Sequence, residues 1–219
     1  MNDDLALSIS EVFYSIQGES SRAGYPCVFI RTAGCNLRCR YCDAPYTYEE
    51  AGKQIKISAL LDKVAEHPRA LVEITGGEPL IHKEVYPLMV ELLKQHRTVL
   101  VETNGSVSLE EVPDGVNVIM DLKCPDSAMH SCMDLDNLDL LTPNDEVKFV
   151  ICSRRDYEWA VGMLNQYEII EKVKNVLFSP VRHLLQPAIL AQWMLDDGLP
   201  VRLQLQLHTF IWQDKKRGA

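Results

Sequence analysis

Residues 70–92 read ALVEITGGEPLIHKEVYPLMVEL and contain the pattern that indicates the fold class. The run Ala70–Thr75 is apolar and rich in residues that favour strands, and a Gly-Gly turn follows it. Apolar residues then recur at helical spacing, at Val85, Leu88, Met89 and Leu92. A strand, a turn and an amphipathic helix in this order predict one βα unit of a parallel sheet.

The same alternation of strand and helix patterns continues along the chain. The predicted strands are Pro26–Thr32, Ala70–Thr75, Thr98–Glu102, Val116–Leu122, Glu146–Cys152, Asn175–Phe178 and Val201–His208. A closed eight-stranded barrel usually takes ~250 residues, and this chain has 219. We therefore predict an α/β fold with an open, partial TIM-like barrel of about six parallel strands and outer helices, built as a single domain over residues 1–219. An open doubly wound sheet is the alternative, although no Gly-rich phosphate-binding motif follows the first strand.

Composition and charge exclude several classes of protein. Apolar residues make up 47% and charged residues 24%, as in ordinary globular proteins. The chain has no apolar run of the ~20 residues that span a bilayer. Its 22 Lys and Arg face 31 Asp and Glu, a net charge of −9 that argues against nucleic-acid binding. The acidic start MNDDLALSIS resembles neither a secretory signal nor a transit peptide, so we expect a cytoplasmic protein without membrane contact.

Three of the seven cysteines fall within eight residues, in the segment CNLRCRYC from Cys35 to Cys42. The spacing C-x3-C-x2-C directs three thiolates at one centre. Structural zinc requires four ligands, which here would include a lone histidine such as His67 or His82. A [4Fe–4S] cluster held by three cysteines instead leaves one iron open to an external ligand. The remaining cysteines are predicted to be small buried residues.

The cysteine spacing resembles that of the radical S-adenosylmethionine (SAM) superfamily. In that superfamily an aromatic residue, here Tyr41, precedes the third cysteine and lies beside the adenine, and a GGEP motif, here residues 76–79, meets the methionine amino group. The resemblance implies a [4Fe–4S] cluster on Cys35, Cys39 and Cys42. It implies SAM contacts at Tyr41, Cys42, Asp43, Gly77, Glu78, Asp121, Leu122, Lys123 and Ser179.

Three further blocks resemble one family of this superfamily, the 7-carboxy-7-deazaguanine synthases. They are FYSIQGE at 13–19, FIRTAGCNL at 29–37 and RLQLQLH at 202–208. The resemblance implies a carbon–nitrogen lyase that contracts the ring of 6-carboxy-5,6,7,8-tetrahydropterin. The product would be 7-carboxy-7-deazaguanine, formed with loss of ammonia in queuosine and 7-deazapurine biosynthesis. A glycyl-radical enzyme activase and a noncatalytic metal-binding module are the alternatives.

The same resemblance implies a substrate site. Its residues would be Ile16, Gln17, Gly18, Glu19, Arg31, Thr75, His208 and Ala219, several of them in a short N-terminal segment. Physical chemistry agrees, because a carboxylate such as Glu19 suits ring N–H donors and Arg31 suits a carboxylate. In the last predicted strand, leucines alternate with polar residues. We expect the leucines to pack under helices while Gln204, Gln206 and His208 line a polar lumen; an edge strand with a solvated face is the alternative.

One position departs from the family pattern. The family usually reads Cys-Asp-Thr, with the threonine hydroxyl on a magnesium ion, whereas this chain has Ala44 at the third position. Thr47 is a candidate substitute, and the requirement for Mg2+ is left open. The resemblance further implies a flavodoxin or ferredoxin as electron donor, and a homodimer.

Overall fold

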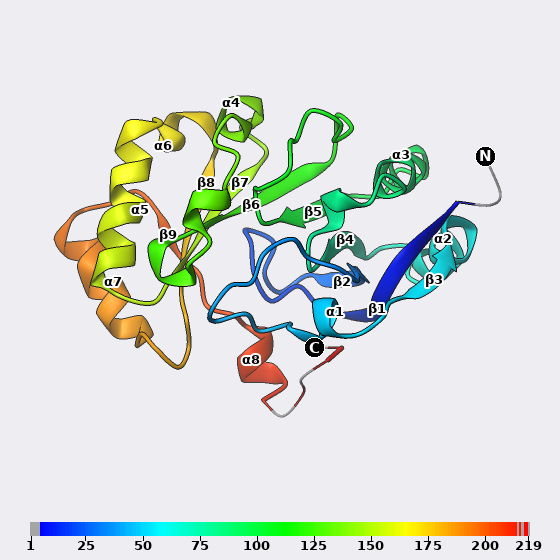
Figure 1. The fold of residues 1–219 in the computed structure, drawn as a ribbon, viewed down its shortest axis with the longest axis horizontal. Helices are drawn as coiled ribbons and strands as arrows, with labels where there is room; N and C mark the ends of the chain where they lie inside the picture. The colour runs from blue at the N-terminus through cyan, green and yellow to red at the C-terminus, as the bar shows by residue number, and fades with distance from the viewer. Residues whose placement is uncertain (1–4, 214, 216, 219) are drawn as a thin grey trace.

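A nine-stranded sheet runs through the part of the chain that the computed structural model describes, residues 5–213, 215 and 217–218. The spatial order is β3-β1-β2-β4-β5-β6-β7-β8-β9 (Figure 1). The strands span Ala6–Ile16 (β1), Pro26–Thr32 (β2), Lys53–Lys56 (β3), Leu71–Gly76 (β4), Val99–Thr103 (β5), Asn117–Lys123 (β6), Glu146–Ile151 (β7), Asn175–Pro180 (β8) and Arg202–Leu203 (β9). Because β3 and β9 are the two edges, the sheet is an open barrel, as predicted.

Neighbouring strands pair in parallel along the run β2-β4-β5-β6-β7-β8-β9. β3 lies at the opposite edge of the sheet, next to β1. The six predicted strands between Pro26 and Phe178 are confirmed, with bounds that differ by at most two residues. The prediction missed β1 and β3, which pair antiparallel at one edge. The missed β1 mixes Ser8, Ser10 and Glu11 with apolar residues, so it lacks the continuous apolar run that marks a central strand.

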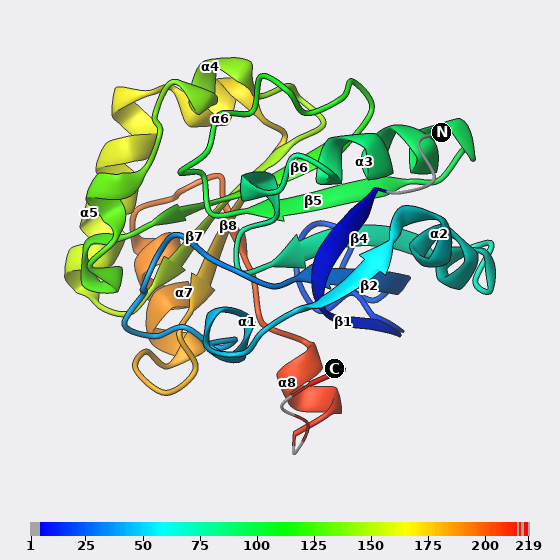
Figure 2. The same ribbon diagram turned by 45° about the vertical axis from the view of Figure 1, so that its right-hand side comes forward.

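Helices cover the outer face of the sheet (Figure 2). The α-helices span Tyr46–Glu49 (α1), Ile57–Ala65 (α2), Val85–Lys94 (α3), Asn137–Leu140 (α4), Arg154–Gln166 (α5), Ile169–Lys172 (α6), Pro187–Asp196 (α7) and His208–Ile211 (α8). Three 3-10 turns span Pro79–Ile81 (η1), Pro125–Ser127 (η2) and His130–Cys132 (η3). Within the described ranges, no helix combines the length and the apolar character that a membrane crossing requires.

The hydrophobic core lies between these helices and the outer face of the sheet. Alternate strand residues face the helices, and Ile74, Phe149 and Phe178 are fully buried there. They share one core with helix residues such as Leu88 and Tyr157. Because successive side chains of a strand point to opposite faces, the residues between them point to the inner face of the barrel.

The inner face is polar and charged toward the carboxyl ends of the strands. In the sheet register Arg31 of β2 pairs with Thr75 of β4, and Asp121 of β6 pairs with Lys148 of β7. Buried polar residues on this face are Glu73, Thr75, Asp121, Lys148 and Ser179. Ligands of parallel barrels bind where strands end, so this polar face is the candidate site.

The C-terminal segment differs from the predicted strand over Val201–His208. Only Arg202 and Leu203 pair with β8, and the Gln204 N–H makes one more hydrogen bond to that strand, donating to the Phe178 carbonyl at 2.9 Å. The Leu207 N–H donates to the Gly18 carbonyl at 2.8 Å, and α8 begins at the next residue. The leucines predicted to pack under helices do not all do so, since Leu203 and Leu205 are each 37% exposed. Gln204 is buried, as expected for a polar residue facing the lumen.

Candidate active site

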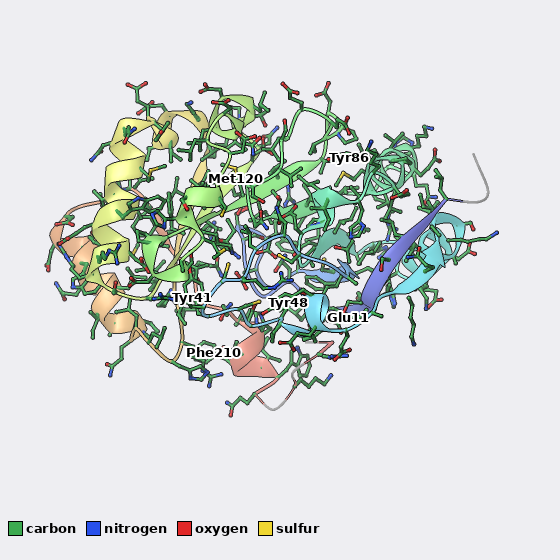
Figure 3. All side chains as sticks on the ribbon, viewed as in Figure 1. Glu11, Tyr41, Tyr48, Tyr86, Met120 and Phe210 are labelled. Atoms are coloured by element: carbon green, nitrogen blue, oxygen red, sulfur yellow. The ribbon has the colours of Figure 1, made fainter. Side chains whose placement is uncertain are left out.

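The three clustered cysteines lie in an irregular loop between β2 and α1. Backbone bonds fix this loop at both ends: the Gly34 N–H donates to the Thr47 carbonyl at 2.6 Å, and the Arg40 N–H donates to the Ser127 carbonyl at 3.1 Å. All three thiols are free and partly exposed. Tyr41 and Tyr48, labelled in Figure 3, come from this loop and from α1. One loop therefore carries all three candidate ligands.

The surroundings of the thiols suit sulfur ligands of an iron–sulfur cluster. The Cys35 Sγ accepts hydrogen bonds from the Leu37 N–H at 3.4 Å and from the Asn104 side chain at 3.9 Å. Burial raises the pKa of the Cys39 thiol to about 11, and the nearby Lys123 opposes that rise. Donors and a cation beside sulfur stabilise the deprotonated form that binds metal.

The histidines considered as zinc ligands are engaged elsewhere. The His82 ring nitrogen Nε2 is 2.7 Å from the Ala33 carbonyl oxygen, and the His67 ring stacks on Tyr14 at a centroid distance of 3.8 Å. The residues present thus fit a cluster bound through three thiolates better than the zinc site considered above.

The Gly-Gly turn after β4 packs directly against the cysteine loop. The Glu78 N–H donates to the Gly34 carbonyl at 2.9 Å, and the Gly77 N–H donates to the Thr32 carbonyl at 3.3 Å. A Cβ atom added at Gly77 would overlap the Gly34 carbonyl oxygen and lie 2.6 Å from the Cys35 Cβ. The close approach of the two backbones therefore requires glycine at position 77.

Glu78 joins this turn to the end of the next strand. Its side chain is fully buried and accepts hydrogen bonds from the Leu80 N–H at 3.0 Å, the Thr103 hydroxyl at 2.8 Å and the Asn104 N–H at 2.7 Å. Burial raises the pKa of Glu78 to about 7, against the effect of these donors. Both carboxylate oxygens therefore accept hydrogen bonds from the protein, and these bonds tie the Gly-Gly turn to the end of β5.

A buried ion network lies at the centre of the inner face. The Lys148 ammonium contacts Glu102, lies 2.9 Å from a Glu19 oxygen and 3.4 Å from an Asp121 oxygen. Burial disfavours the charged lysine, but these carboxylates outweigh it and raise the pKa of Lys148. Likewise burial disfavours ionised Glu102, yet Lys148 outweighs it and lowers the pKa of Glu102 to about 2. Lys148 and Glu102 therefore form an ionised pair at the centre of the network.

Asp121 offers a free acceptor inside the site. Its Oδ2 lies 2.8 Å from the Lys123 ammonium, whereas its buried Oδ1 has no hydrogen-bond partner in the described part of the chain. A buried carboxylate oxygen without a donor is costly unless a ligand supplies one. Leu122 between them is buried in the core. The predicted SAM contacts at residues 121 and 123 thus lie together at the end of β6.

The N-terminal segment after β1 reaches across the inner face. The Gln17 amide donates to Glu73, and the Glu19 Oε1 accepts from the Gln206 amide at 3.1 Å. Burial, together with Glu102 and Glu19, raises the pKa of Glu73 well above its usual value. The segment therefore brings Glu19 next to Gln206 of the C-terminal segment, while Gln17 lies against Glu73 of β4.

Arg31 and Thr75 flank this segment on the adjoining strands. The Arg31 Nε donates to the Glu11 Oε1 at 2.9 Å, and the Tyr46 hydroxyl donates to the same oxygen at 2.9 Å. The Thr75 hydroxyl donates to Glu102 at 3.1 Å. The Nε bond leaves the terminal nitrogens of Arg31 as further donors.

Beside Tyr41 lies a cavity of about 360 Å3, lined by Arg40, Tyr41, Asp126, Cys152 and Leu184. The Tyr41 hydroxyl donates to the Val150 carbonyl at 3.3 Å, which fixes the ring against β7. The cavity therefore lies beside the Tyr41 ring, near the carboxyl end of β7.

Comparison with known proteins agrees with this geometry. The model of the radical SAM superfamily matches residues 29–181. A 7-carboxy-7-deazaguanine synthase from Koribacter versatilis is 44% identical, over 97% of this chain and 100% of its own length. One from Chlorobaculum tepidum is 43% identical over the full length of both. The crystal structure of QueE from Escherichia coli shares the fold, with a TM-score of 0.76 at 24% identity over 93% of this chain and 95% of that one.

The chain belongs to the 7-carboxy-7-deazaguanine synthase family of radical SAM enzymes. The cysteine spacing and the three sequence blocks predicted this family, and the comparisons confirm that prediction. Radical SAM enzymes use a [4Fe–4S] cluster and SAM, which are therefore the cofactors of the family.

The remaining residues predicted from this family's pattern lie in different surroundings. Ile16 ends β1, Ser179 is buried near the end of β8, and Asp43 is exposed on the cysteine loop. His208 lies against Gly18, where an added Cβ would be 3.0 Å from the His208 Cβ. Ala219 lies outside the described residues.

The magnesium site of the family pattern finds no threonine oxygen here. Ala44 has no side-chain ligand, and the candidate substitute Thr47 is 1% exposed. Its hydroxyl donates to the Ala44 carbonyl at 2.8 Å, within the turn that begins α1. The residues at this position therefore do not fit the family's magnesium ligand set.

Sequence reasoning missed four acidic or basic residues of the inner face, Glu11, Glu73, Glu102 and Lys148. Each charge lies within a predicted or observed strand. A charged residue inside an otherwise apolar strand is a signal, because it must point away from the core. Applied to LVEIT, VLVET and EVKFV, that signal finds Glu73, Glu102 and Lys148.

Replacing Gly77 by alanine should disrupt cluster assembly in this enzyme. The added methyl group overlaps the Gly34 carbonyl and displaces the cysteine loop. We expect iron per chain after anaerobic reconstitution to fall at least severalfold. The control is Gly162→Ala, where the added Cβ meets nothing within 4 Å. Equal iron content in the two variants would contradict the close packing described here.

Glu78 should make stability depend on pH. Folding raises the pKa of Glu78 from 4.5 to about 7. The stability that its protonated carboxyl group contributes is therefore fully present below about pH 4.5 and is lost as the pH rises through 7. The unfolding free energy of wild type minus that of Glu78→Gln should therefore fall by about 1–3 kcal/mol between pH 5 and pH 8, because only wild type loses stability as this group ionises. Urea denaturation measures it, with the exposed Glu66→Gln as control; a difference independent of pH would refute the assignment.

Proposed function

We propose that this chain converts 6-carboxy-5,6,7,8-tetrahydropterin into 7-carboxy-7-deazaguanine, with ring contraction and loss of ammonia. The supporting observation is the packing of the Gly77 backbone against Gly34 and Cys35 at the open end of a charged inner face. This packing puts the cysteine loop, the Gly-Gly turn and the polar inner face side by side. Two relatives that match over their full length are named 7-carboxy-7-deazaguanine synthase.

The cofactors supply the radical chemistry and the protein supplies position. A [4Fe–4S] cluster on Cys35, Cys39 and Cys42, with SAM at its open iron, would supply the 5′-deoxyadenosyl radical that removes hydrogen from C6 of the pterin. The buried Asp121 Oδ1 has the chemistry to accept a hydrogen bond from a SAM hydroxyl or amine. The cavity beside Tyr41 has room for a flat ring stacked on its aromatic side chain.

The inner face supplies groups that match the pterin. The Glu19 carboxyl group lies between Lys148 and Gln206, where its oxygens can accept hydrogen bonds from ring N–H donors. The free nitrogens of Arg31 can bind a carboxylate in a bidentate manner. Residues 17–22 cross this face, and the hydrogen bond from the Leu207 N–H to the Gly18 carbonyl ties them to the C-terminal segment. In this position they would restrict the access of water to the reacting carbon.

The wider context of the enzyme follows from its family. We propose that residues 1–219 act as a single catalytic domain, in the cytoplasm and as a homodimer, with a flavodoxin or ferredoxin as electron donor. The acidic net charge of −9 fits a small-molecule enzyme without nucleic-acid or membrane partners.

Turnover should require each of the three clustered cysteines. Anaerobic protein with reductant, SAM and carboxytetrahydropterin should form 7-carboxy-7-deazaguanine, and Cys35→Ala, Cys39→Ala and Cys42→Ala should each abolish it. Cys132 is exposed, contrary to the prediction that the cysteines outside the cluster are buried, whereas Cys27, Cys124 and Cys152 are buried as expected. Cys132→Ala serves as the control and should retain activity. If wild type cleaves SAM but leaves the pterin unchanged, an activase or another radical SAM reaction replaces this one. If it forms no 5′-deoxyadenosine, the radical mechanism itself is wrong and a noncatalytic module is favoured.

Magnesium should matter less to this enzyme than to its Ala44→Thr variant. Position 44 has no side-chain oxygen, and the Thr47 hydroxyl is buried in a turn. We expect kcat/KM of wild type to change less than about twofold, roughly 0.4 kcal/mol, between EDTA and saturating Mg2+. Ala44→Thr should gain a larger response, and Ala44→Val should not, because valine has the shape of threonine without the hydroxyl. Equal responses in wild type and Ala44→Thr would contradict this.

A further inference from the structure

Glu73 lies on the inner face of the barrel, two residues before Thr75 on the same side of β4. Its side chain is buried, and so is that of Gln17, the first residue after β1. The Gln17 amide nitrogen Nε2 donates to the Glu73 Oε2. This hydrogen bond joins the N-terminal segment to a central strand that lies 56 residues away in the sequence.

The other end of the Gln17 amide holds the backbone of Glu19. The Glu19 N–H donates to the Gln17 Oε1 at 2.7 Å. A backbone N–H can only donate, so this bond fixes which end of the amide is oxygen and directs the amide nitrogen toward Glu73. The Gln17 side chain therefore links Glu73 to the backbone of Glu19.

The backbone of Gln17 is fixed independently of its side chain. The Gln17 N–H donates to the Tyr25 carbonyl at 2.8 Å, and the Gly24 N–H donates to the Gln17 carbonyl at 2.8 Å. These two bonds close the base of the loop that contains Glu19. Because the base is held against β1 and β2, the side-chain amide is the group that passes the position of β4 on to Glu19.

The protonation chemistry of Glu73 suits a neutral acceptor. Burial, together with Glu102 and Glu19, raises the pKa of Glu73 well above 4.5, although Lys148 and Arg31 oppose the rise. The raised pKa favours the uncharged acid, which still accepts a hydrogen bond through its carbonyl oxygen. Glutamine offers the same oxygen in the same shape.

We propose that Glu73 is a positioning residue for the substrate, which acts through the Gln17 amide to hold Glu19 where its carboxyl group meets the pterin ring. The inference rests on the proposed function, in which Glu19 accepts hydrogen bonds from the ring N–H donors. In this role Glu73 supplies one acceptor oxygen at a fixed place. Neither its charge nor its proton takes part in the reaction.

The experiment compares the KM for carboxytetrahydropterin of wild type, Glu73→Met and Glu73→Gln after anaerobic reconstitution. Methionine is similar in length to glutamate but has no strong acceptor, so the Gln17 amide loses its partner. We expect KM to rise about tenfold, which corresponds to about 1.4 kcal/mol, with a smaller change in kcat. Glu73→Gln restores the acceptor and should restore both constants to within about twofold of wild type.

A double-mutant cycle tests the link itself. Gln17→Met breaks the same connection from its other side, so Glu73→Met/Gln17→Met should raise KM no further than the more impaired single variant. Tyr157→Phe is the structural control, because it removes a buried hydroxyl that donates to the Trp193 carbonyl at 2.9 Å and to Asp197 at 2.7 Å, between α5 and α7. Its KM should stay within about twofold of wild type.

The remaining readouts separate positioning from other roles. Iron per chain, and 5′-deoxyadenosine formed without the pterin, should be equal in all variants, because neither requires Glu19. If Glu73→Met lowers the iron content, Gln17→Met alone carries the same expectation for KM.

A wild-type KM in both Glu73→Met and Gln17→Met, or effects of the two that add fully, would show that Glu73 does not position Glu19. Loss of kcat in Glu73→Gln would likewise overturn the proposal, because it would mean that the proton or the charge of Glu73 takes part. If wild type forms no 7-carboxy-7-deazaguanine, the proposed function is wrong and the inference falls with it.

Discussion

The arrangement of the whole site depends on one contact between two stretches of backbone, where Gly77 lies against Gly34 and Cys35. No side chain separates them, so the end of β4 and the cysteine loop are held at a fixed spacing by the Glu78–Gly34 hydrogen bond. That contact places a loop with three thiols beside the carboxyl ends of a parallel sheet. The loop that carries the proposed cluster ligands therefore borders the polar inner face.

The inner face accepts charge because its charges compensate one another. Burying ions costs several kcal/mol each unless partners are close, and here Lys148 lies among Glu19, Glu102 and Asp121. The arrangement is not fully satisfied, since Asp121 keeps a buried oxygen without a donor. Sites that bind polar ligands commonly keep such groups, which the ligand completes. The network therefore favours a ligand rich in hydrogen-bond donors over an apolar one.

Much of the fold could be predicted from local pattern, because buried parallel strands such as Val99–Thr103 and Asn175–Pro180 contain short continuous apolar runs. The edge strands could not, since Lys53–Lys56 is mostly polar and is a strand only through pairing with β1. Motif spacing found the cysteine loop and the glycine turn. The carboxylates around Lys148, those of Glu19, Glu102 and Asp121, come from segments far apart in the sequence, and only the folded sheet brings them together. The predicted strand over Val201–His208 was wrong for the same reason, because the Leu207 N–H donates to the carbonyl of Gly18, a residue distant in the sequence.

The central claim is that three cysteines of one loop hold a cluster whose fourth iron binds an external sulfonium compound. The most direct measurement is electron–nuclear double resonance on the reduced, reconstituted protein with SAM labelled by 15N and 17O in its amino and carboxylate groups. The account predicts four irons per chain and strong hyperfine coupling from both labels, as expected for direct coordination to one iron. A centre with one metal ion, or a four-iron cluster without coupling to either label, would contradict it.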